Sequence, residues 1–245
     1  MTGRRLYRRT LKNERLSSFT ITVKETDLWI AVSSHAYDQN LVRDAETYTW
    51  RLRRSLELYL EKNPLLKECL KPCLHDPDAP HIVHTMVTAA NKAGVGPMAA
   101  VAGAIAELVG RHLMRNVDEV IVENGGDNFI KAAQPVTVGI YAGKSQLSGR
   151  MALLLDPAKT PLGVCTSSGT VGPSLSFGCV DAAITVSPST ALADAAATAL
   201  GNMVGNKEDL DLAIMEAAKI EGLSGALLVK EDKVAAWGDI ELVRL

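Results

Sequence analysis

The stretch from Gly94 to Asp127, which reads GVGPMAAVAGAIAELVGRHLMRNVDEVIVENGGD, decides the fold. Residues 98–114 are rich in Ala, Val, Ile and Leu, and Pro97 before them is suited to the first turn of a helix. Two glycines, Gly103 and Gly110, lie inside this predicted helix, although glycine costs a helix about 1 kcal/mol relative to alanine. Glycines in such places usually allow another backbone or a ligand to approach closely.

This predicted helix leads into a strand over residues 119–123 and then into Asn124-Gly125-Gly126-Asp127, a tight turn that tolerates positive φ. A helix of small residues beside a strand and a bare-backbone turn offers main-chain groups to a phosphate or a metal ion. The alternative is a helix packed closely on a sheet and followed by an ordinary hairpin. The stretch alone fits both interpretations.

Length and composition limit the classes of protein to which the chain can belong. Its 245 residues are 47% hydrophobic, which is enough for one large domain or two half-sized ones. The net charge of −2 gives no general argument for a nucleic-acid or membrane partner, and 4% aromatic residues argue against stacking platforms for single strands. Four arginines within residues 4–9 are interpreted as the solvated edge of a strand. No apolar run has the length of a signal peptide or a membrane span, so we expect a cytoplasmic protein with reduced thiols.

On both sides of the opening stretch, groups of predicted strands alternate along the chain with groups of predicted helices. Apolar alternation predicts strands, and spacing of three and four predicts helices. Strands are predicted over residues 7–11, 18–24, 28–33, 128–131, 135–142, 150–155, 163–166, 179–187, 225–230, 233–238 and 240–243. Further helices are predicted over residues 39–62, 82–92, 191–203 and 207–221. This order predicts an α+β fold in which antiparallel sheets carry helices on one face. We expect a single domain over residues 1–245 with two pseudo-repeated halves, about 1–143 and 144–245.

Asp194 and Thr198 are the first candidate pair for chemistry. They lie four residues apart on the predicted helix after Pro188, so their oxygens share one face of the helix. A carboxylate and a hydroxyl form a minimal site for Mg²⁺, which is completed by carbonyls, waters or substrate phosphates. The alternative is that Asp194 only interacts favourably with the helix dipole and that Thr198 is incidental.

Residues 167–178, which read SSGTVGPSLSFG, form a second candidate because their amides and hydroxyls can cradle phosphates. The loop matches neither a P-loop nor a dinucleotide fingerprint, and an ordinary long loop is the alternative. The Gly143-Lys144-Ser145 sequence has Val138 where the first glycine of a P-loop would stand, so we interpret it as a turn.

A third candidate is a transition-metal or redox site near Cys69 and Cys73, although their spacing is weak for zinc and both could be core residues. The sequence shows no nucleophile elbow and no histidine with an obvious serine or cysteine companion. The histidines considered with the two cysteines are His75, His81 and His84.

Four short segments together resemble the ApbE family, the Mg²⁺-dependent FAD:protein FMN transferases. Residues 183–200, AITVSPSTALADAAATAL, resemble the family's "SVTV…ADALATAL" signature, and residues 120–127, VIVENGGD, resemble its "vniGGd" strand and turn. Residues 165–169, CTSSG, are similar to its "aTSG" segment, and residues 103–107, GAIAE, to its "GxIxK/EG" helix start. Order and spacing agree over roughly residues 95–205. The resemblance is to the shorter bacterial and archaeal branch, and it implies tandem T-fold-like units.

The resemblance also implies a ligand set and an activity. Asp194, Thr198 and the backbone carbonyl of Ala104 would hold Mg²⁺, and FAD or a related nucleotide would be the small-molecule partner. T-fold proteins often assemble through their sheets, so a homodimer is a further expectation. The residues expected to contact the flavin or its phosphates are Glu107, Asn124, Gly125, Gly126, Thr166, Ser167, Ser168 and Gly169.

The sequence departs from the family pattern in the segment that follows the "TSG" motif. The family carries "HIIDPRTG" there, whereas residues 169–178 are shorter and lack both the histidine and the Asp-Pro-Arg. Leu108 replaces the glycine after Glu107, and the family's N-terminal Met-Gly-Thr segment is not recognisable. Two functions therefore stand as alternatives: an Mg²⁺-dependent enzyme that transfers FMN or cleaves a pyrophosphate, and a flavin- or nucleotide-binding protein that has lost transferase activity.

Overall fold

The computed structural model describes residues 15–143, 145–169 and 178–245. The strand predicted at residues 7–11, the arginines at 4–9, Lys144 and most of the Ser/Thr/Gly loop therefore lie outside the described residues.

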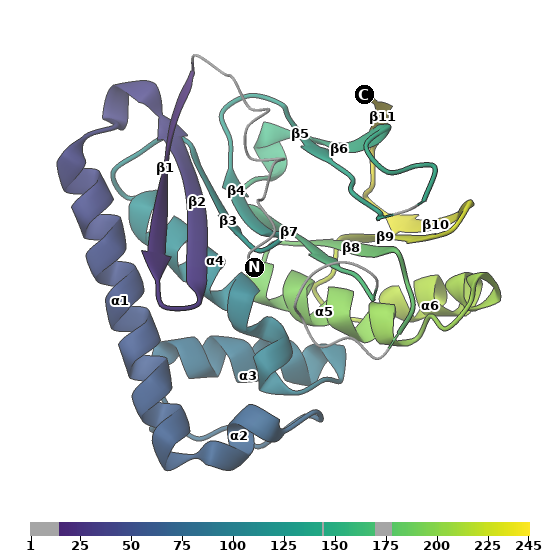
Figure 1. Ribbon diagram of the computed structural model, residues 1–245, viewed down its shortest axis with the longest axis horizontal. Coiled ribbons are helices and arrows are strands. Elements are labelled where there is room, and N and C mark those ends of the chain that lie inside the picture. Colours follow the sequence, from purple (N-terminus) through teal and green to yellow (C-terminus); the bar gives the residue numbers. More distant parts are fainter. Residues whose placement is uncertain (1–14, 144, 170–177) are drawn as a thin grey trace.

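An eight-stranded antiparallel sheet forms the middle layer of the molecule (Figure 1). Its strands, in spatial order, are β1 (Leu16–Val23), β2 (Thr26–Ser33), β3 (Val120–Asn124), β4 (Asp127–Lys131), β7 (Leu162–Ser167), β8 (Ala182–Ser187), β9 (Gly225–Lys230) and β10 (Lys233–Gly238). Helices interrupt the chain between β2 and β3 and again between β8 and β9. The predicted α+β class, with antiparallel sheets and packed helices, is confirmed.

One face of this sheet is covered by helices. The helices that contact the sheet are α1 (Gln39–Lys62), α4 (Val101–Leu113), α5 (Thr190–Asn202) and α6 (Leu210–Ala217), whereas α3 (His81–Ala93) packs on α4 and α5, and α2 (Pro64–Glu68) packs on α1. Short 3-10 turns precede α4 at Pro97–Ala100 and α6 at Lys207–Asp209, so the helices predicted at 98–114 and 207–221 are each shorter than expected. Their apolar faces and the near face of the sheet form a continuous buried core that includes Phe129, Val122 and Leu113.

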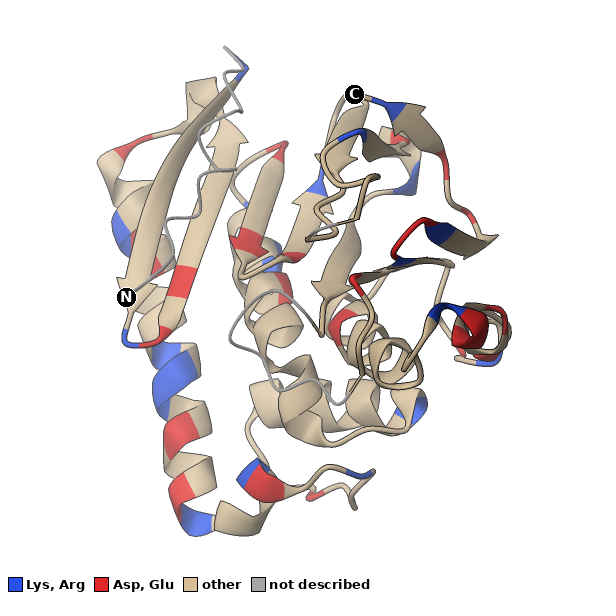
Figure 2. Ribbon diagram, turned by 45° about the vertical axis from the view of Figure 1, so that its right-hand side comes forward, with Lys and Arg blue, Asp and Glu red and all other residues tan. Residues whose placement is uncertain are grey.

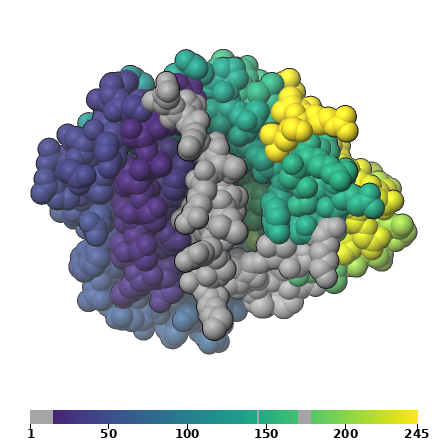
Figure 3. All heavy atoms as spheres, turned by 45° about the horizontal axis from the view of Figure 1, so that its top comes forward, coloured from purple at the N-terminus to yellow at the C-terminus, as the bar shows by residue number. Residues whose placement is uncertain are grey.

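The opposite face carries a small three-stranded sheet, which has the order β11 (Leu242–Arg244), β6 (Met151–Leu155) and β5 (Val136–Gly139). The side chains of strand β8 pack on both faces of the large sheet. Ile184 and Val186 pack toward the small sheet, whereas Ala183 packs with the core beneath α5 and α6 because side chains alternate along a strand. Figure 3 shows the yellow C-terminal strands beside the teal segment that contains β5 and β6.

Local signals explain the ends of several elements. The carboxylate of Asp38 caps α1 by accepting the amide of Leu41 at 2.7 Å. Gly94 ends α3 at a φ of 75°, in the left-handed conformation that glycine adopts without strain. Gly125 and Gly126 have φ values of 72° and 116°, which the two-residue turn between β3 and β4 requires.

The two halves of the chain meet along a seam at the centre of the molecule. We use "seam" for the pairing of β4 with β7 and the antiparallel packing of α4 on α5. A Cβ on Gly103 would lie 2.5 Å from the Thr190 carbonyl oxygen, and one on Gly110 would lie 2.0 Å from the Phe129 ring. Close packing is therefore the reason for both glycines in α4. The division of the domain near residue 143 stays a prediction.

Among the described residues, no single helix combines the length and the apolar composition that a membrane crossing needs. Helix α3 and the segment Pro97–Leu113 meet both criteria only when taken together, and the two are bent by 105°.

Candidate functional site

Asp194 lies at the seam, half-buried on the second turn of α5. Its Oδ2 accepts a hydrogen bond of 2.7 Å from the backbone amide of Gly103, in the first turn of α4. The first amides of a helix have no partner within the helix, so a carboxylate from another element satisfies one of them and interacts favourably with the helix dipole. The chain thus brings together two segments that are 91 residues apart.

The turn between β3 and β4 adjoins the same end of α4. The side-chain amide of Asn124 donates to the carbonyl oxygen of Ala102 at 3.1 Å. Asn124 also pairs directly with Asp127 across the hairpin, so their side chains share the helix-covered face of the sheet. The turn glycines lie between these two residues, and the β3–β4 turn is therefore held against the first turn of α4.

Asp127 contributes a second carboxylate, and it is only 7% exposed. Hydrogen bonding with the backbone amide of Thr166 and with the Cys165 thiol favours its ionised form, and the thiol also donates to the Thr190 carbonyl oxygen at 3.4 Å. Burial, followed by the nearby Glu123 carboxylate, raises the pKa of Asp127 to about 7, and the two hydrogen bonds oppose that rise. Near neutral pH, Asp127 is therefore partly protonated.

Asp127 is close enough to Asp194 to oppose its ionisation. Burial and then the charge of Asp127 raise the pKa of Asp194 well above its ordinary value, against the amides of Gly103 and Ala102. Cys165, buried between them, has a thiol whose pKa burial and the two carboxylates raise strongly, so it stays protonated. Neither carboxylate forms an ion pair with any residue in the described parts of the chain.

The other end of the seam contains Glu107, which is 6% exposed. Its Oε2 accepts from the Ala191 amide and from the Ser189 hydroxyl, both at 3.1 Å. Its Oε1 pairs with Arg111 Nε at 2.9 Å. Glu107 therefore caps the start of α5, just as Asp194 caps the start of α4, but among the described residues a cation lies beside Glu107 and none pairs with Asp194. Its predicted contact with a flavin stays a prediction, and the oxygens expected to make that contact are already hydrogen-bonded within the protein.

The remaining predicted site residues surround the Asp194 end of the seam. Thr198 is half-buried one turn after Asp194, and its hydroxyl has no hydrogen-bond partner among the described residues. Ala104 is fully buried in the first turn of α4, and the carbonyl contacted from the β3–β4 turn belongs instead to Ala102. At the end of β7, Ser167 lies near Gly201 of α5.

The described ends of the Ser/Thr/Gly loop lie against each other and against the last turn of α5. A Cβ on Gly169 would lie 2.1 Å from the Gly178 carbonyl oxygen, and one on Gly178 would lie 1.9 Å from the Gly201 carbonyl oxygen. Ser168 is half-buried beside them. The loop therefore leaves and rejoins the fold beside the helix that carries Asp194. Residues 170–177 lie outside the described part.

The cysteines and histidines near α3 form no metal site among the described residues, where no three His, Cys, Asp or Glu side chains converge on one point. His75 and His84 stack with their ring centroids 6.5 Å apart. The main chain of Cys73 is bound by Asn91, and burial raises the pKa of its thiol. These contacts are structural, so they favour neither metal binding nor a reactive thiolate.

Sequence reasoning gave no role to Asp127 or Cys165, although both belong to segments that carried the family resemblance. The available signal was the placement of Asp127 directly after two glycines, at the first residue of a strand. Nothing in the local sequence places Cys165 between two acids, because that requires the pairing of β4 with β7.

Residues 8–229 match the family model described as "AbpE bacteria". The chain is 40% identical over 230 residues to a UPF0280 protein of Methanocaldococcus jannaschii, an alignment that covers 91% of this chain and 92% of the relative. It is 42% identical over 190 residues to a UPF0280 protein of Methanosarcina acetivorans, with coverage of 77% and 75%.

Solved structures share the fold at low sequence identity. The ApbE protein of Thermotoga maritima superposes with a TM-score of 0.56 at 13% identity, covering 90% of this chain and 96% of that one. The apo flavinyl transferase ApbE of Pseudomonas stutzeri gives a TM-score of 0.52 at 15% identity, with coverage of 91% and 93%. At these identities the likeness shows the fold alone.

Proposed function

The chain belongs to the AbpE bacteria family, within the ApbE-like superfamily, and from this premise we propose that the Asp194 end of the seam binds Mg²⁺ together with FAD or a related nucleotide. In this proposal the protein is a flavin transferase or a pyrophosphate-cleaving enzyme. The solved structures that share its fold include proteins named as flavin transferases.

The observation that carries the proposal is a shortage of positive charge. Asp127 opposes the ionisation of Asp194, and no cationic side chain among the described residues compensates them. Two buried acids without a partner cation are costly to ionise, and a bound cation removes that cost. The Glu107 end of the same seam has its own arginine and needs no ion.

The chemistry of the donor set fits a hard cation. The groups are carboxylate, hydroxyl and carbonyl oxygens, and no described cluster offers the three His, Cys, Asp or Glu ligands typical of zinc. Asp194, Thr198 and the Ala104 carbonyl would hold Mg²⁺, and waters or phosphate oxygens would fill the other positions. When bound, the ion would neutralise charge on a pyrophosphate and on its leaving group.

The chain's own residues would bind and orient the nucleotide. The Asn124–Gly126 turn and the Thr166–Gly169 segment would line its phosphates with main-chain groups, and the latter segment would add the hydroxyls of Thr166, Ser167 and Ser168. Glycines at the turn leave room for a ligand to approach the backbone. Cys165 would remain a protonated thiol below the site, as its raised pKa requires. No residue is assigned as acid, base or nucleophile.

The direct test is to incubate the protein with FAD and Mg²⁺ and to follow the release of FMN and AMP, with and without EDTA. We expect Mg²⁺-dependent release that Asp194→Asn abolishes. Asp232→Asn, a change at an exposed acid in the β9–β10 turn, should leave the rate unchanged. No release of either product by the wild-type protein would contradict the enzymatic proposal.

Loss of the histidine-containing segment favours the second function, a flavin- or nucleotide-binding protein without turnover. This alternative predicts a thermal shift on adding FAD and Mg²⁺ that Asp194→Asn removes, although no FMN or AMP forms. The same shift assay therefore separates a binding protein from a protein with no flavin site.

A further inference from the structure

Trp50 lies on the solvent-facing side of α1 and is 55% exposed. The opposite side of the helix carries its buried residues, which are Leu41, Ala45, Thr49, Leu52 and Leu56. Trp50 is therefore not part of the core. The indole ring of Trp50 lies on a face of α1 that does not pack against the core. It makes no ring contact within the described residues.

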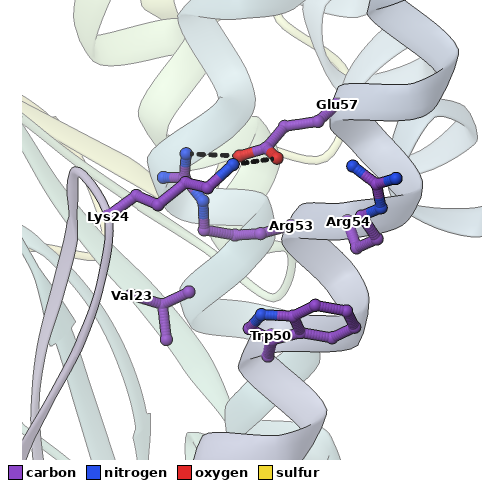
Figure 4. Close-up of a pocket in the computed structure, with 6 residues that line it drawn as sticks. All are labelled: Val23, Lys24, Trp50, Arg53, Arg54 and Glu57. Carbon is purple, nitrogen blue, oxygen red and sulfur yellow. Dashed lines mark hydrogen bonds and ion pairs between the residues drawn. The ribbon is translucent and has the colours of Figure 1, made fainter.

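Two surface hollows share Trp50 as a wall. The first has a volume of ≈ 240 Å³ and lies between α1 and the β1–β2 hairpin, as Figure 4 shows. Its lining includes Val23 and Lys24 from the hairpin and Arg54 from α1. The second, of ≈ 460 Å³, continues along α1 past Arg51. Together they make a shallow apolar and basic surface on either side of one indole ring.

The arginines on this surface differ in whether an acidic side chain pairs with them. Arg53 is held by Glu25 and Glu57, and it donates to Thr26 at 2.7 Å. Arg51 and Arg54 form no ion pair among the described residues, and Arg43 contacts only the neutral side chain of Asn40, at 2.9 Å. Figure 2 shows that charged residues of both signs follow the length of α1. Of the acids lining the hollows, Glu57 is already paired, and only Glu46 lacks a cation.

Three arginines without an acidic partner among the described residues, set against one such acid, give this surface an excess of positive charge that complements an acidic partner. Exposed tryptophan and arginine are the residue types that most often dominate protein interfaces. A single aromatic residue is a poor platform for a nucleic-acid strand, which stacks successive bases on several rings. The surface therefore fits a protein segment better than a nucleic acid.

We propose that the outer face of α1, from Arg43 to Glu57, is a docking surface for an acidic segment of a partner protein. An apolar side chain of that segment packs beside Trp50 and Val23, and its carboxylates pair with Arg43, Arg51 and Arg54. The proposal is independent of the flavin site, because it uses none of the residues at the seam.

The test uses fluorescence anisotropy with three labelled probes: a helical peptide presenting Glu and Leu on one face, its counterpart with Lys in place of Glu, and an oligothymidylate. We expect only the Glu peptide to bind the full-length protein. Trp50→Ala and Arg54→Glu should each weaken binding about tenfold, and raising the salt should weaken it further. Lys207→Glu, an equal charge change at an exposed site remote from α1, is the matched control and should leave binding unchanged.

Three results would overturn the proposal. One is the absence of Glu-peptide binding by the wild-type protein at low salt. Another is binding that Trp50→Ala and Arg54→Glu leave unchanged while the thermal unfolding of both variants matches the wild type. The third is oligothymidylate binding that depends on the same two residues, which would identify the surface as a nucleic-acid site.

Discussion

The two ends of the α4–α5 seam are built alike but differ in charge. At one end Glu107 of α4 caps the start of α5, and at the other Asp194 of α5 caps the start of α4. Arg111 lies 2.9 Å from Glu107, whereas the charged group that shifts the pKa of Asp194 is another acid, Asp127. Among the described residues, the first end has a cation beside its carboxylate and the second has none.

In the proposed function, this difference separates a structural carboxylate from a ligand-binding one. Both acids satisfy helix amides, so capping alone does not mark a site. At the Asp194 end a raised pKa occurs together with the lack of an ion pair among the described residues, as the proposed cation site would require. The comparison predicts that substitutions at the Glu107 end lower the free energy of unfolding. Substitutions at the Asp194 end should instead weaken the binding of Mg²⁺ and the nucleotide.

The largest loss of stability is expected for Glu107→Ala. It leaves the Ala191 amide and the Ser189 hydroxyl without their acceptor and Arg111 without its ion pair. The free energy of unfolding, measured with urea, should fall by about 3 kcal/mol. Glu107→Gln keeps an acceptor oxygen, so its free energy of unfolding should fall by less than that of Glu107→Ala. An Ala variant as stable as the wild type would show that this end of the seam is not a structural clamp.

A smaller loss is expected for Gly103→Ala, which tests how closely the helices must approach. The new methyl group would lie 2.5 Å from the Thr190 carbonyl oxygen and 2.6 Å from the Cβ of Asp194. Separating α4 from α5 should cost about 2 kcal/mol in urea unfolding. Gly205→Ala, where the nearest atom is a side-chain oxygen 3.4 Å away, is the control and should change stability little. Equal losses of unfolding free energy in Gly103→Ala and Gly205→Ala would argue against tight contact between α4 and α5.

Because the pKa of Asp127 is raised, we expect Asp127→Asn to be more stable than the wild-type protein, by an amount that depends on pH. The native pKa of Asp127 is about 7 against an ordinary 3.8, so the wild-type protein loses stability as pH rises from about 4 to about 7. The variant lacks this titration. Without metal, its advantage over the wild type should therefore grow by up to about 4 kcal/mol between pH 4 and pH 8. Urea unfolding at both pH values in EDTA measures it, and a constant difference would contradict the raised pKa.

The smallest effect is expected for Arg111→Met, which keeps most of the packing and removes the charge. Because 44% of the Arg111 side chain is exposed, solvent screens its pair with Glu107. Urea unfolding should show a loss of about 1 kcal/mol, reduced at high salt. A loss as large as that of Glu107→Ala would mean that the ion pair, rather than the cap, stabilises this end.

Local sequence signals predicted most of the fold because they act over a few residues. Examples are the Asp38 cap, the paired glycines of the β3–β4 turn and the helical spacing of residues 39–62. The site was predicted only in part, since its members come from five elements, which are α4, α5, β3, β4 and β7. Helical spacing placed Asp194 and Thr198 on one face, but it could not show that Glu107 faces Ser189 or that Asp127 lies near Asp194. Those contacts depend on the crossing of α4 and α5 and on the pairing of β4 with β7.

The most direct test of the uncompensated acid pair is calorimetric titration of the protein with Mg²⁺ in the presence of FAD, repeated with Mn²⁺ and followed by electron paramagnetic resonance. Wild-type protein and the surface control Asp232→Asn should bind one ion equally well. Asp194→Asn, whose amide oxygen still accepts from Gly103, should remain folded and bind at least about tenfold more weakly. Unchanged ion binding by a folded Asp194→Asn protein would contradict the account.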